Sequence, residues 1–370
     1  MQKKFIRYGS IVIGGLMTAM LVACGTQTAA PKQSAKNSTI VTPKNPENIL
    51  KAKATHTLIP GLTALAKDVK VNFDIIAIDQ QTHLLYANDR STKGVDVFDV
   101  ATPKAKYLRT IKLGNLPNGL VIVKDQNKIF AALTDSTVAV IDINPTSPKL
   151  NTVVDKINTN GKKRADEMDY DPKEKKLYVA NGDDGFITVI NAVNDKIIKK
   201  IDNLGALEQP RYNPADGMMY VTAYADNAII KINPIKDVVV KKFDLGIKIK
   251  PKGFDINPKT NQAIIGGDEQ QTLAWDFNTG KVIKTFNQVG GGDSVLYDST
   301  VDMFFFGSDQ FKSGSVIGLW SGSPIKFIGN VPAALKSHNV AYDQTNKMVY
   351  TCDEKKGEIG LLSFPLPKQK

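Results

Sequence analysis

Seven polar residues recur along this chain at a spacing that could bring them together at one site. They lie 41 to 48 residues apart and are Asp74, Asn118, Asp166, Glu208, Lys252, Asp293 and His338. Clustered carboxylates can share a divalent cation such as Ca²⁺, which takes oxygen ligands, and a histidine beside them favours a transition metal. Like charges that crowd together also raise carboxyl pKa values, which can produce a general acid or base.

The elements that would position these residues are short strands in a repeating unit. Residues 170–201 read YDPKEKKLYVANGDDGFITVINAVNDKIIKKI, which is three β-branched or aromatic runs separated by turns rich in Gly, Asn and Asp. Such runs are typical of β-hairpins. The chain shows no sustained helical period of apolar residues, so we expect an all-β fold.

The unit recurs seven times, with a central strand residue at Tyr86, Phe130, Tyr178, Tyr220, Ile264, Phe305 and Tyr350. Seven residues before each is a turn position, and six of these seven are Asp or Asn: Asp79, Val123, Asp171, Asn213, Asn257, Asp298 and Asp343. A period in the forties with about four strands per unit predicts a seven-bladed β-propeller of four-stranded blades over residues 54–365. The last unit lacks room for a fourth strand, so we expect Ala54–Ile59 to complete that blade and close the ring.

Three units resemble the YVTN repeat, namely LLYANDRSTKGVDVFDV, LYVANGDDGFITVINAVNDKIIKKI and MYVTAYADNAIIKINPIKDVVVKKF. The chain therefore resembles the YVTN-repeat, YncE-like β-propeller family. The resemblance implies the fold more than the function, because proteins of this family use one scaffold for many different binding functions. Units five and six, QAIIGGDEQQTLAWDF and MFFFGSDQFKSGSVIGLW, depart from the consensus.

In a propeller the innermost strand of each blade begins at one mouth of the central channel, so the seven polar residues are predicted to form a ring there. Turn carboxylates at the same mouth would add to it: Asp89, Asp135, Asp183, Asp184, Asp226, Asp268, Asp309, Asp353 and Glu354. The opposite face would hold lysine-bearing turns such as residues 173–176. The sequence thus predicts one acidic mouth on a basic protein, although polar channel mouths with carboxylates that cap strand ends are also ordinary in propellers.

The charged side chains near this mouth admit several roles. A divalent cation is the one cofactor we consider, with Asp166, Glu208, Asp293 and His338 as tentative ligands. Arg90, Arg164 and Arg211 could clamp an anion, but salt bridges to local carboxylates are the expected role. Neither His56 nor His83 has a spaced partner for metal binding. Trp275 and Trp320 occupy equivalent third-strand positions and are expected to pack between blades.

The N-terminus has the pattern of a bacterial lipoprotein signal peptide. Lys3, Lys4 and Arg7 precede an apolar run that ends in Leu21-Val22-Ala23-Cys24. We expect residues 1–23 to be removed, Cys24 to carry lipid, and residues 24–53 to form a flexible tether. The predicted protein is an exported monomer, anchored to the bacterial membrane and facing outside the cytoplasm. Cys352, the other cysteine, is expected to be buried and unpaired.

Three functions fit these features. The first is a non-catalytic cell-envelope propeller that binds a ligand or protein partner at the acidic mouth. The second is a metal-dependent hydrolase or lactonase-like enzyme with its site in the same mouth. The third, implied by the family resemblance, is single-stranded DNA binding; it requires a basic groove with exposed aromatic residues. The net charge is +11, but the lysines are scattered through turns, so we expect no nucleic-acid partner. An enzyme is less favoured than a binding protein, since the sequence has no Ser-His-Asp spacing, CxxC pair or HExxH motif.

Overall fold

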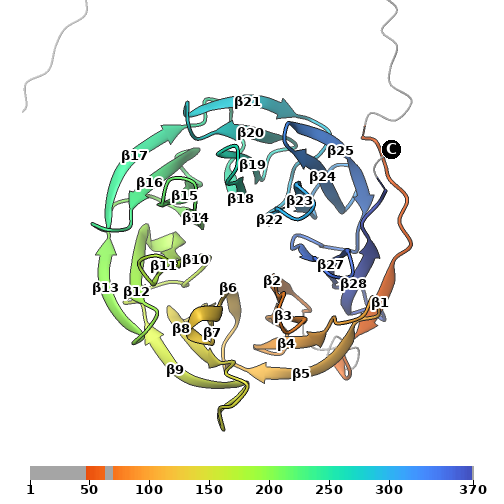
Figure 1. The fold of residues 1–370 in the computed structure, drawn as a ribbon, viewed down its shortest axis with the longest axis horizontal. Coiled ribbons are helices and arrows are strands. Elements are labelled where there is room, and N and C mark those ends of the chain that lie inside the picture. Colours follow the sequence, from red (N-terminus) through yellow and green to blue (C-terminus); the bar gives the residue numbers. More distant parts are fainter. Residues whose placement is uncertain (1–46, 63–69, 369–370) are drawn as a thin grey trace, which may run out of the picture. The chain divides into compact units, whose positions relative to one another are not determined.

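The computed structural model describes residues 47–62 and 70–368, which belong to one compact unit from Lys44 to Lys370. In this unit seven four-stranded antiparallel sheets are arranged as blades around a central channel (Figure 1). The prediction of an all-β, seven-bladed propeller is therefore confirmed. The predicted signal peptide, Cys24 and the first part of the predicted tether lie outside the described residues. None of the described helices is long and apolar enough to cross a membrane.

Each blade runs from an inner strand at the channel to an outer strand at the rim, and in the first six blades the order along the chain is the order across the sheet. The first blade consists of β2 (Phe73–Asp79), β3 (Leu84–Asp89), β4 (Gly94–Asp99) and β5 (Lys106–Lys112), and the second of β6 (Pro117–Val123), β7 (Lys128–Leu133), β8 (Thr137–Asp142) and β9 (Thr152–Asn158). The third blade consists of β10 (Met168–Asp171), β11 (Lys176–Asn181), β12 (Phe186–Asn191) and β13 (Lys196–Ile201). The fourth consists of β14 (Leu207–Asn213), β15 (Met218–Ala223), β16 (Ala228–Asn233) and β17 (Val238–Asp244). Two short 3-10 helices, η1 (Lys124–Gln126) and η2 (Gly182–Asp184), follow β6 and β11.

The last three blades complete the ring. They consist of β18 (Pro251–Asn257), β19 (Gln262–Gly267), β20 (Thr272–Asp276) and β21 (Lys281–Phe286); β22 (Val295–Asp298), β23 (Met303–Ser308), β24 (Val316–Gly322) and β25 (Ile325–Pro332); β26 (Ala341–Asp343), β27 (Met348–Asp353), β28 (Gly360–Pro365) and β1 (Thr55–Leu58). The last blade takes its outer strand from the N-terminal side of the propeller.

Closure by this N-terminal strand is confirmed. β1 pairs antiparallel with β28, from Thr55 opposite Ser363 to Leu58 opposite Gly360. The chain joins the propeller even before β1, because Ile49 forms a parallel bridge with Asn330 of β25. The segment predicted as a tether ends at residue 53, so its last residues contact the folded body in the structure.

The predicted turn positions are the last residues of the seven inner strands. At six of them the side chain accepts a hydrogen bond through Oδ1 from the backbone N–H two residues later; these are Asp79, Asp171, Asn213, Asn257, Asp298 and Asp343. Asp and Asn favour such turns because their short side chains replace a backbone acceptor. The recurrence of these residues along the sequence is therefore explained by strand termination.

The core consists of apolar layers between neighbouring blades. The central residues Tyr86, Phe130, Tyr178, Tyr220, Ile264, Phe305 and Tyr350 are all buried. Trp275 of β20 packs edge-on against Phe243 of β17 in the preceding blade, with ring centroids 6.1 Å apart. Trp320 of β24 packs in the same way against Phe286 of β21, at 5.9 Å. The two tryptophans therefore join blades, as expected. Cys352 is buried and unpaired.

Candidate functional site

Six of the seven predicted ring residues line one cavity of about 230 Å³, which we call the charged cavity. They are Asp74, Asp166, Glu208, Lys252, Asp293 and His338, and each comes from a different blade. Asn118 does not line this cavity, since its amide donates to the Ala165 carbonyl at 2.7 Å and its Oδ1 accepts from Arg90. The other lining residues are Arg90, Arg164, Glu167, Asp309 and Gln310. The structure thus brings the predicted residues together, while their role in binding remains a prediction.

The inner strands place these residues at the same end of the channel. Asp74, Glu208 and Lys252 are the second residues of β2, β14 and β18. Asp166, Asp293 and His338 lie two or three residues before the first residues of β10, β22 and β26. All inner strands run in the same direction along the channel, so their first residues meet at one mouth.

Two glycines permit the close packing of this mouth. Gly119 follows Asn118 in β6, and a Cβ atom there would lie 2.5 Å from the Asp166 carbonyl oxygen and 2.8 Å from the Glu167 Cα. Gly253 follows Lys252 in β18, and a Cβ atom there would collide with the Asp293 carbonyl oxygen. In both places the absent side chain lets the next blade bring its carboxylate segment to the cavity.

Every basic side chain that lines the charged cavity already has a carboxylate partner; the first is Arg90. It pairs with Asp74 and donates to Asn72 Oδ1 at 3.1 Å and to the Pro117 carbonyl at 3.0 Å. Its guanidinium thus joins the inner strands of the first two blades. Salt bridging, rather than an anion clamp, is the role that these contacts support.

The remaining cations are engaged in the same way. Arg164 lies 2.9 Å from Asp166, 3.2 Å from Asp183 and 3.9 Å from Glu208. Lys252 pairs with Asp268 at 3.0 Å. His338 lies 3.7 Å from Asp74 through Nε2.

The carboxylates outnumber these cations. Six carboxylates line the cavity, against three arginine or lysine side chains and His338. Within the described residues, the side chains of Glu167, Asp293 and Asp309 have no hydrogen bond or ion pair, and Glu208 has only its long contact to Arg164. The mouth is therefore less uniformly acidic than the sequence predicts, and half of its six carboxylates are without a hydrogen bond or ion pair within the described residues.

Burial perturbs the ionisation of this site. Burial raises the pKa of Asp166 to about 7, with Asp74 and Asp293 adding to the effect and Arg164 opposing it. Burial and neighbouring carboxylates also raise the pKa of Glu167 and of Glu208 well above the ordinary value. A positive charge brought close to these carboxyl groups would lower their pKa values again, because it favours the ionised form.

His338 shows the opposite balance. Its burial alone would lower the pKa of the imidazole, but the nearby carboxylates of Asp74 and Asp293 raise that pKa to about 9. The imidazole is therefore a cation at neutral pH, and its positive charge offsets part of the carboxylate excess. A protonated imidazole is a poor metal ligand, since coordination requires a free nitrogen lone pair.

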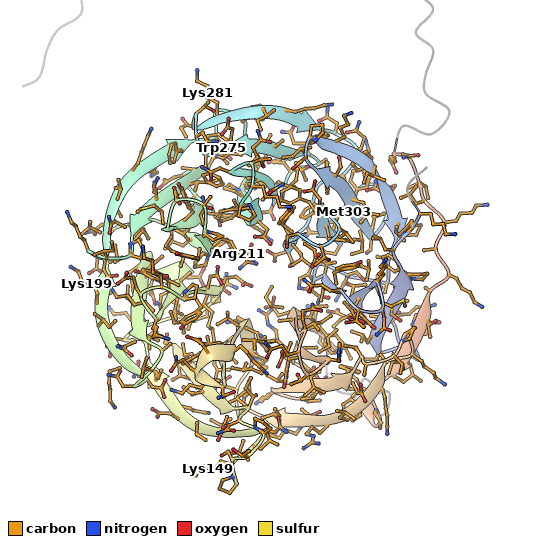
Figure 2. All side chains as sticks on the ribbon, viewed as in Figure 1. Lys149, Lys199, Arg211, Trp275, Lys281 and Met303 are labelled. Atoms are coloured by element: carbon orange, nitrogen blue, oxygen red, sulfur yellow. The ribbon has the colours of Figure 1, made fainter. Side chains whose placement is uncertain are left out.

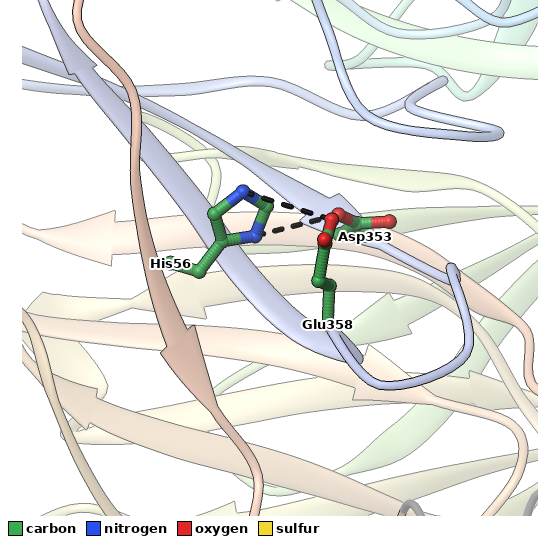
Figure 3. A group of neighbouring side chains, drawn as sticks. All are labelled: His56, Asp353 and Glu358. Carbon is green, nitrogen blue, oxygen red and sulfur yellow. Dashed lines mark ion pairs between the residues drawn. The ribbon is translucent and has the colours of Figure 1, made fainter.

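The tentative metal ligands Asp166, Glu208, Asp293 and His338 all line the cavity but do not converge on one point. Their ligand atoms form no group of three within 4.8 Å of one another; in the parts of the chain that the structure describes, the group that meets this criterion is His56, Asp353 and Glu358 (Figure 3). A preformed chelating centre is thus not present among the described ring residues.

The His56 group lies at the ring closure rather than in the channel. His56 of β1 is 3.4 Å from Asp353 through Nδ1 and 3.9 Å from Glu358 through Nε2. Lys355 also contacts Glu358, at 3.0 Å. The prediction that His56 has no spaced partner is wrong, because its partners come from the other end of the chain through closure of the ring. Each nitrogen faces a different carboxylate, so the arrangement is that of a strand-to-loop ion pair.

Arg211 does not line the charged cavity, so the prediction that it lies near the acidic mouth is wrong. It is three residues beyond Glu208 along β14 and lines a separate cavity of about 420 Å³, which we call the second cavity. Its side chain lies at the channel in the centre of the ring (Figure 2), with Nε 3.9 Å from Asp255. The second cavity reaches the far ends of the inner strands, where Asp298 and Gln344 line it.

Comparison with known proteins supports the fold alone. No protein-family model matches the chain, and no curated protein matches it. Among solved structures, a chain in the crystal structure of a mitotic checkpoint complex aligns with a TM-score of 0.65 and 12% sequence identity, over 95% of this chain and 100% of that chain. As many as 1792 solved chains match, so the architecture is widespread and does not by itself indicate a function.

Proposed function

We propose that this chain is a non-catalytic β-propeller of the cell envelope that binds a small polar ligand in the charged cavity. The observation that carries the proposal is the convergence of charged side chains from six blades on one cavity. Polar groups that converge in a concave site are what ligand recognition requires, and a ring of seven blades is a common scaffold for binding.

The lining residues favour binding over catalysis. The cavity wall in the described part of the chain has no Ser, Thr or Cys side chain that could serve as a nucleophile. Its histidine is held as a cation by Asp74 and is therefore a poor general base. The hydrolase hypothesis would also need carboxylates that converge on a metal ion, and the ring residues do not provide such a group.

The membrane anchor and the family are part of the same proposal. The basic start and apolar run before Cys24 support a lipoprotein signal peptide, which would leave the mature protein anchored through Cys24 outside the cytoplasm. The repeats quoted above support membership of the YVTN-repeat, YncE-like family. We propose a monomer, because a closed seven-bladed ring leaves no blade that needs a partner chain.

A thermal-shift screen of the full-length chain tests the binding proposal. The screen uses small cations, anions and zwitterions at millimolar concentration, first on the wild type and then on Glu208→Gln. We expect at least one class to raise the melting temperature of the wild type by several degrees, and the variant to lose that rise. If no compound of any charge stabilises the wild type, the proposed binding function is wrong.

Cell fractionation tests the anchor separately. The Cys24→Ser variant removes the predicted lipid acceptor and leaves the propeller unchanged. We expect the wild type in the membrane fraction and the variant in the soluble envelope fraction or the medium. Membrane association of the variant equal to that of the wild type would contradict lipidation of Cys24.

A further inference from the structure

The charged cavity contains hydrogen-bond acceptors that no protein donor uses. Arg90, Arg164 and Lys252 are each paired with a carboxylate at the cavity wall or rim. The carboxylates of Glu167 and Asp293 line the same cavity without a hydrogen bond or ion pair within the described residues. A ligand that supplies donors and positive charge would therefore complement the wall, whereas an anion would have to displace an existing salt bridge.

Glu167 is the residue that distinguishes this cavity from an ordinary wet channel mouth. Its exposed fraction is 7%, so it is nine-tenths buried, yet its carboxylate has no partner among the described residues. Buried polar groups are nearly always hydrogen-bonded, so a carboxylate that faces a cavity without a protein partner is open to a ligand. The close approach of the backbone at Gly119 fixes the segment that carries Glu167, so its position is built into the packing of two blades.

The spacing of the acceptors selects the kind of cation. Around a bare Ca²⁺ ion two oxygens lie at most roughly 5 Å apart, since each Ca–O distance is about 2.4 Å. The ring carboxylates offer no group of three ligand atoms within 4.8 Å. Two acceptor oxygens that each lie about 2.9 Å from one ammonium nitrogen can be farther apart than two oxygens around Ca²⁺. Acceptors that bind a cation with two nitrogen centres can be farther apart still.

We propose that the charged cavity binds a compact organic cation with several N–H donors, an alkylammonium or guanidinium group, and that Glu167 accepts a hydrogen bond from it. This inference rests on the proposed binding function and names its ligand class. Glu208 and Asp293 supply the further acceptors, from the blades that follow.

The ionisation of the cavity gives the proposal a second readout. Burial, with the charges of Asp74, Asp166 and Asp293, raises the pKa of Glu167, while Arg211 opposes the rise. A bound cation stabilises the carboxylate and so lowers this pKa again. Binding is therefore accompanied by release of a proton wherever the pH leaves the free Glu167 carboxyl protonated.

Isothermal titration calorimetry on the full-length chain tests the proposal, with putrescine and agmatine as probes. We expect binding of at least one probe, a Kd at least tenfold weaker for Glu167→Gln, and an observed enthalpy that varies with the ionisation enthalpy of the buffer because a proton is released. The matched control is Glu269→Gln, which removes the same charge from a residue that does not line the cavity. The control should bind like the wild type.

Inorganic phosphate and Ca²⁺ serve as the contrasting probes. If phosphate binds and neither organic cation does, the ligand class is wrong although the cavity binds a ligand. Ca²⁺ that displaces putrescine and binds more tightly would also overturn the organic-cation assignment. Equal weakening in Glu167→Gln and Glu269→Gln would show general attraction to an acidic surface and contradict a site at Glu167. If none of these probes nor any compound of the wider screen binds, the proposed function itself fails.

Discussion

The two cavities of the channel lie along the same ring of inner strands, yet their carboxylates differ in the hydrogen bonds that they accept. In the second cavity, Asp169 accepts the Tyr212 backbone N–H at 2.7 Å and Asp255 accepts the Tyr297 N–H at 2.7 Å. Each of these bonds ties an inner strand to the inner strand of the next blade. In the charged cavity, Glu167 and Asp293 have no such partner.

This difference distinguishes carboxylates that support the fold from carboxylates that are left open for a ligand. A buried carboxylate that accepts backbone N–H groups replaces hydrogen bonds lost on folding, so it contributes to the structure. One that accepts nothing costs stability, and proteins retain such costs mainly at functional sites. The basic side chains differ in parallel, since Arg90 has four partners whereas Arg211 has a 3.9 Å ion pair and a hydrogen bond to its own strand.

Replacement of the two arginines should show the largest effect. We expect Arg90→Met to lower the free energy of unfolding by about 3 kcal/mol, because it leaves the nearly buried Asp74 carboxylate and the Pro117 carbonyl without their donor. Arg211→Met should lower it by only about 1 kcal/mol, since few contacts are lost. Urea denaturation at neutral pH measures both. Equal losses of free energy would mean that the basic side chains of the two cavities contribute equally to the stability of the fold.

Glu167→Gln should change the free energy of unfolding by less than Arg90→Met does. At neutral and higher pH it should raise this free energy, whereas the arginine replacements lower it. The raised pKa of Glu167 means that the folded protein binds a proton more tightly than the unfolded chain. Its contribution to stability is therefore full below the unfolded pKa and declines as the pH rises through the folded pKa. Glutamine cannot lose a proton, so we expect the variant to be about 1 kcal/mol more stable than the wild type at pH 8 and equal to it at pH 4.

Urea denaturation of the wild type and Glu167→Gln at both pH values checks this prediction. Glu269→Gln again serves as the control and should shift neither value. Should Glu167→Gln prove less stable than the wild type at pH 8, the Glu167 carboxylate must have a stabilising partner, and the contrast between the two cavities would be lost.

The sequence predicts the scaffold of the site better than its chemistry. The Asp and Asn residues that end the inner strands recur because a tight turn needs them, and five residues before each of them is a position at or just before the start of the same strand. That is why Asp74, Asp166 and Asp293 could be assigned to one mouth. The period of a repeat fixes such positions whether or not the residues bind anything.

Glu167 could not be found in this way. Successive side chains of a strand point to opposite faces, so a ring position at Asp166 predicts that Glu167 faces away from the channel. In the structure β10 begins only at Met168, so the segment before it does not alternate and both carboxylates reach the cavity. The sequence signal that was available is Gly119, since a glycine directly after a ring position indicates close approach of the next blade. The partners of His56 were hidden for a different reason, because only closure of the ring brings them near.

Asp255→Asn provides the smallest expected effect and the sharpest contrast with Glu167→Gln. Burial raises the pKa of Asp255 to about 6 against the opposing charge of Arg211, so its contribution to stability declines between about pH 4 and pH 6 and is constant above. Asparagine removes this decline but keeps only one acceptor oxygen, which can serve the Tyr297 N–H and not also the Ile256 N–H. The gain and the loss oppose each other, so we expect a melting temperature at pH 7 within about 2 °C of the wild type, since 1 kcal/mol corresponds to only a few degrees. A gain in stability as large as that expected for Glu167→Gln would show that backbone hydrogen bonds do not compensate for burial of a carboxylate in this channel. The missing hydrogen bonds of Glu167 would then no longer indicate a ligand site.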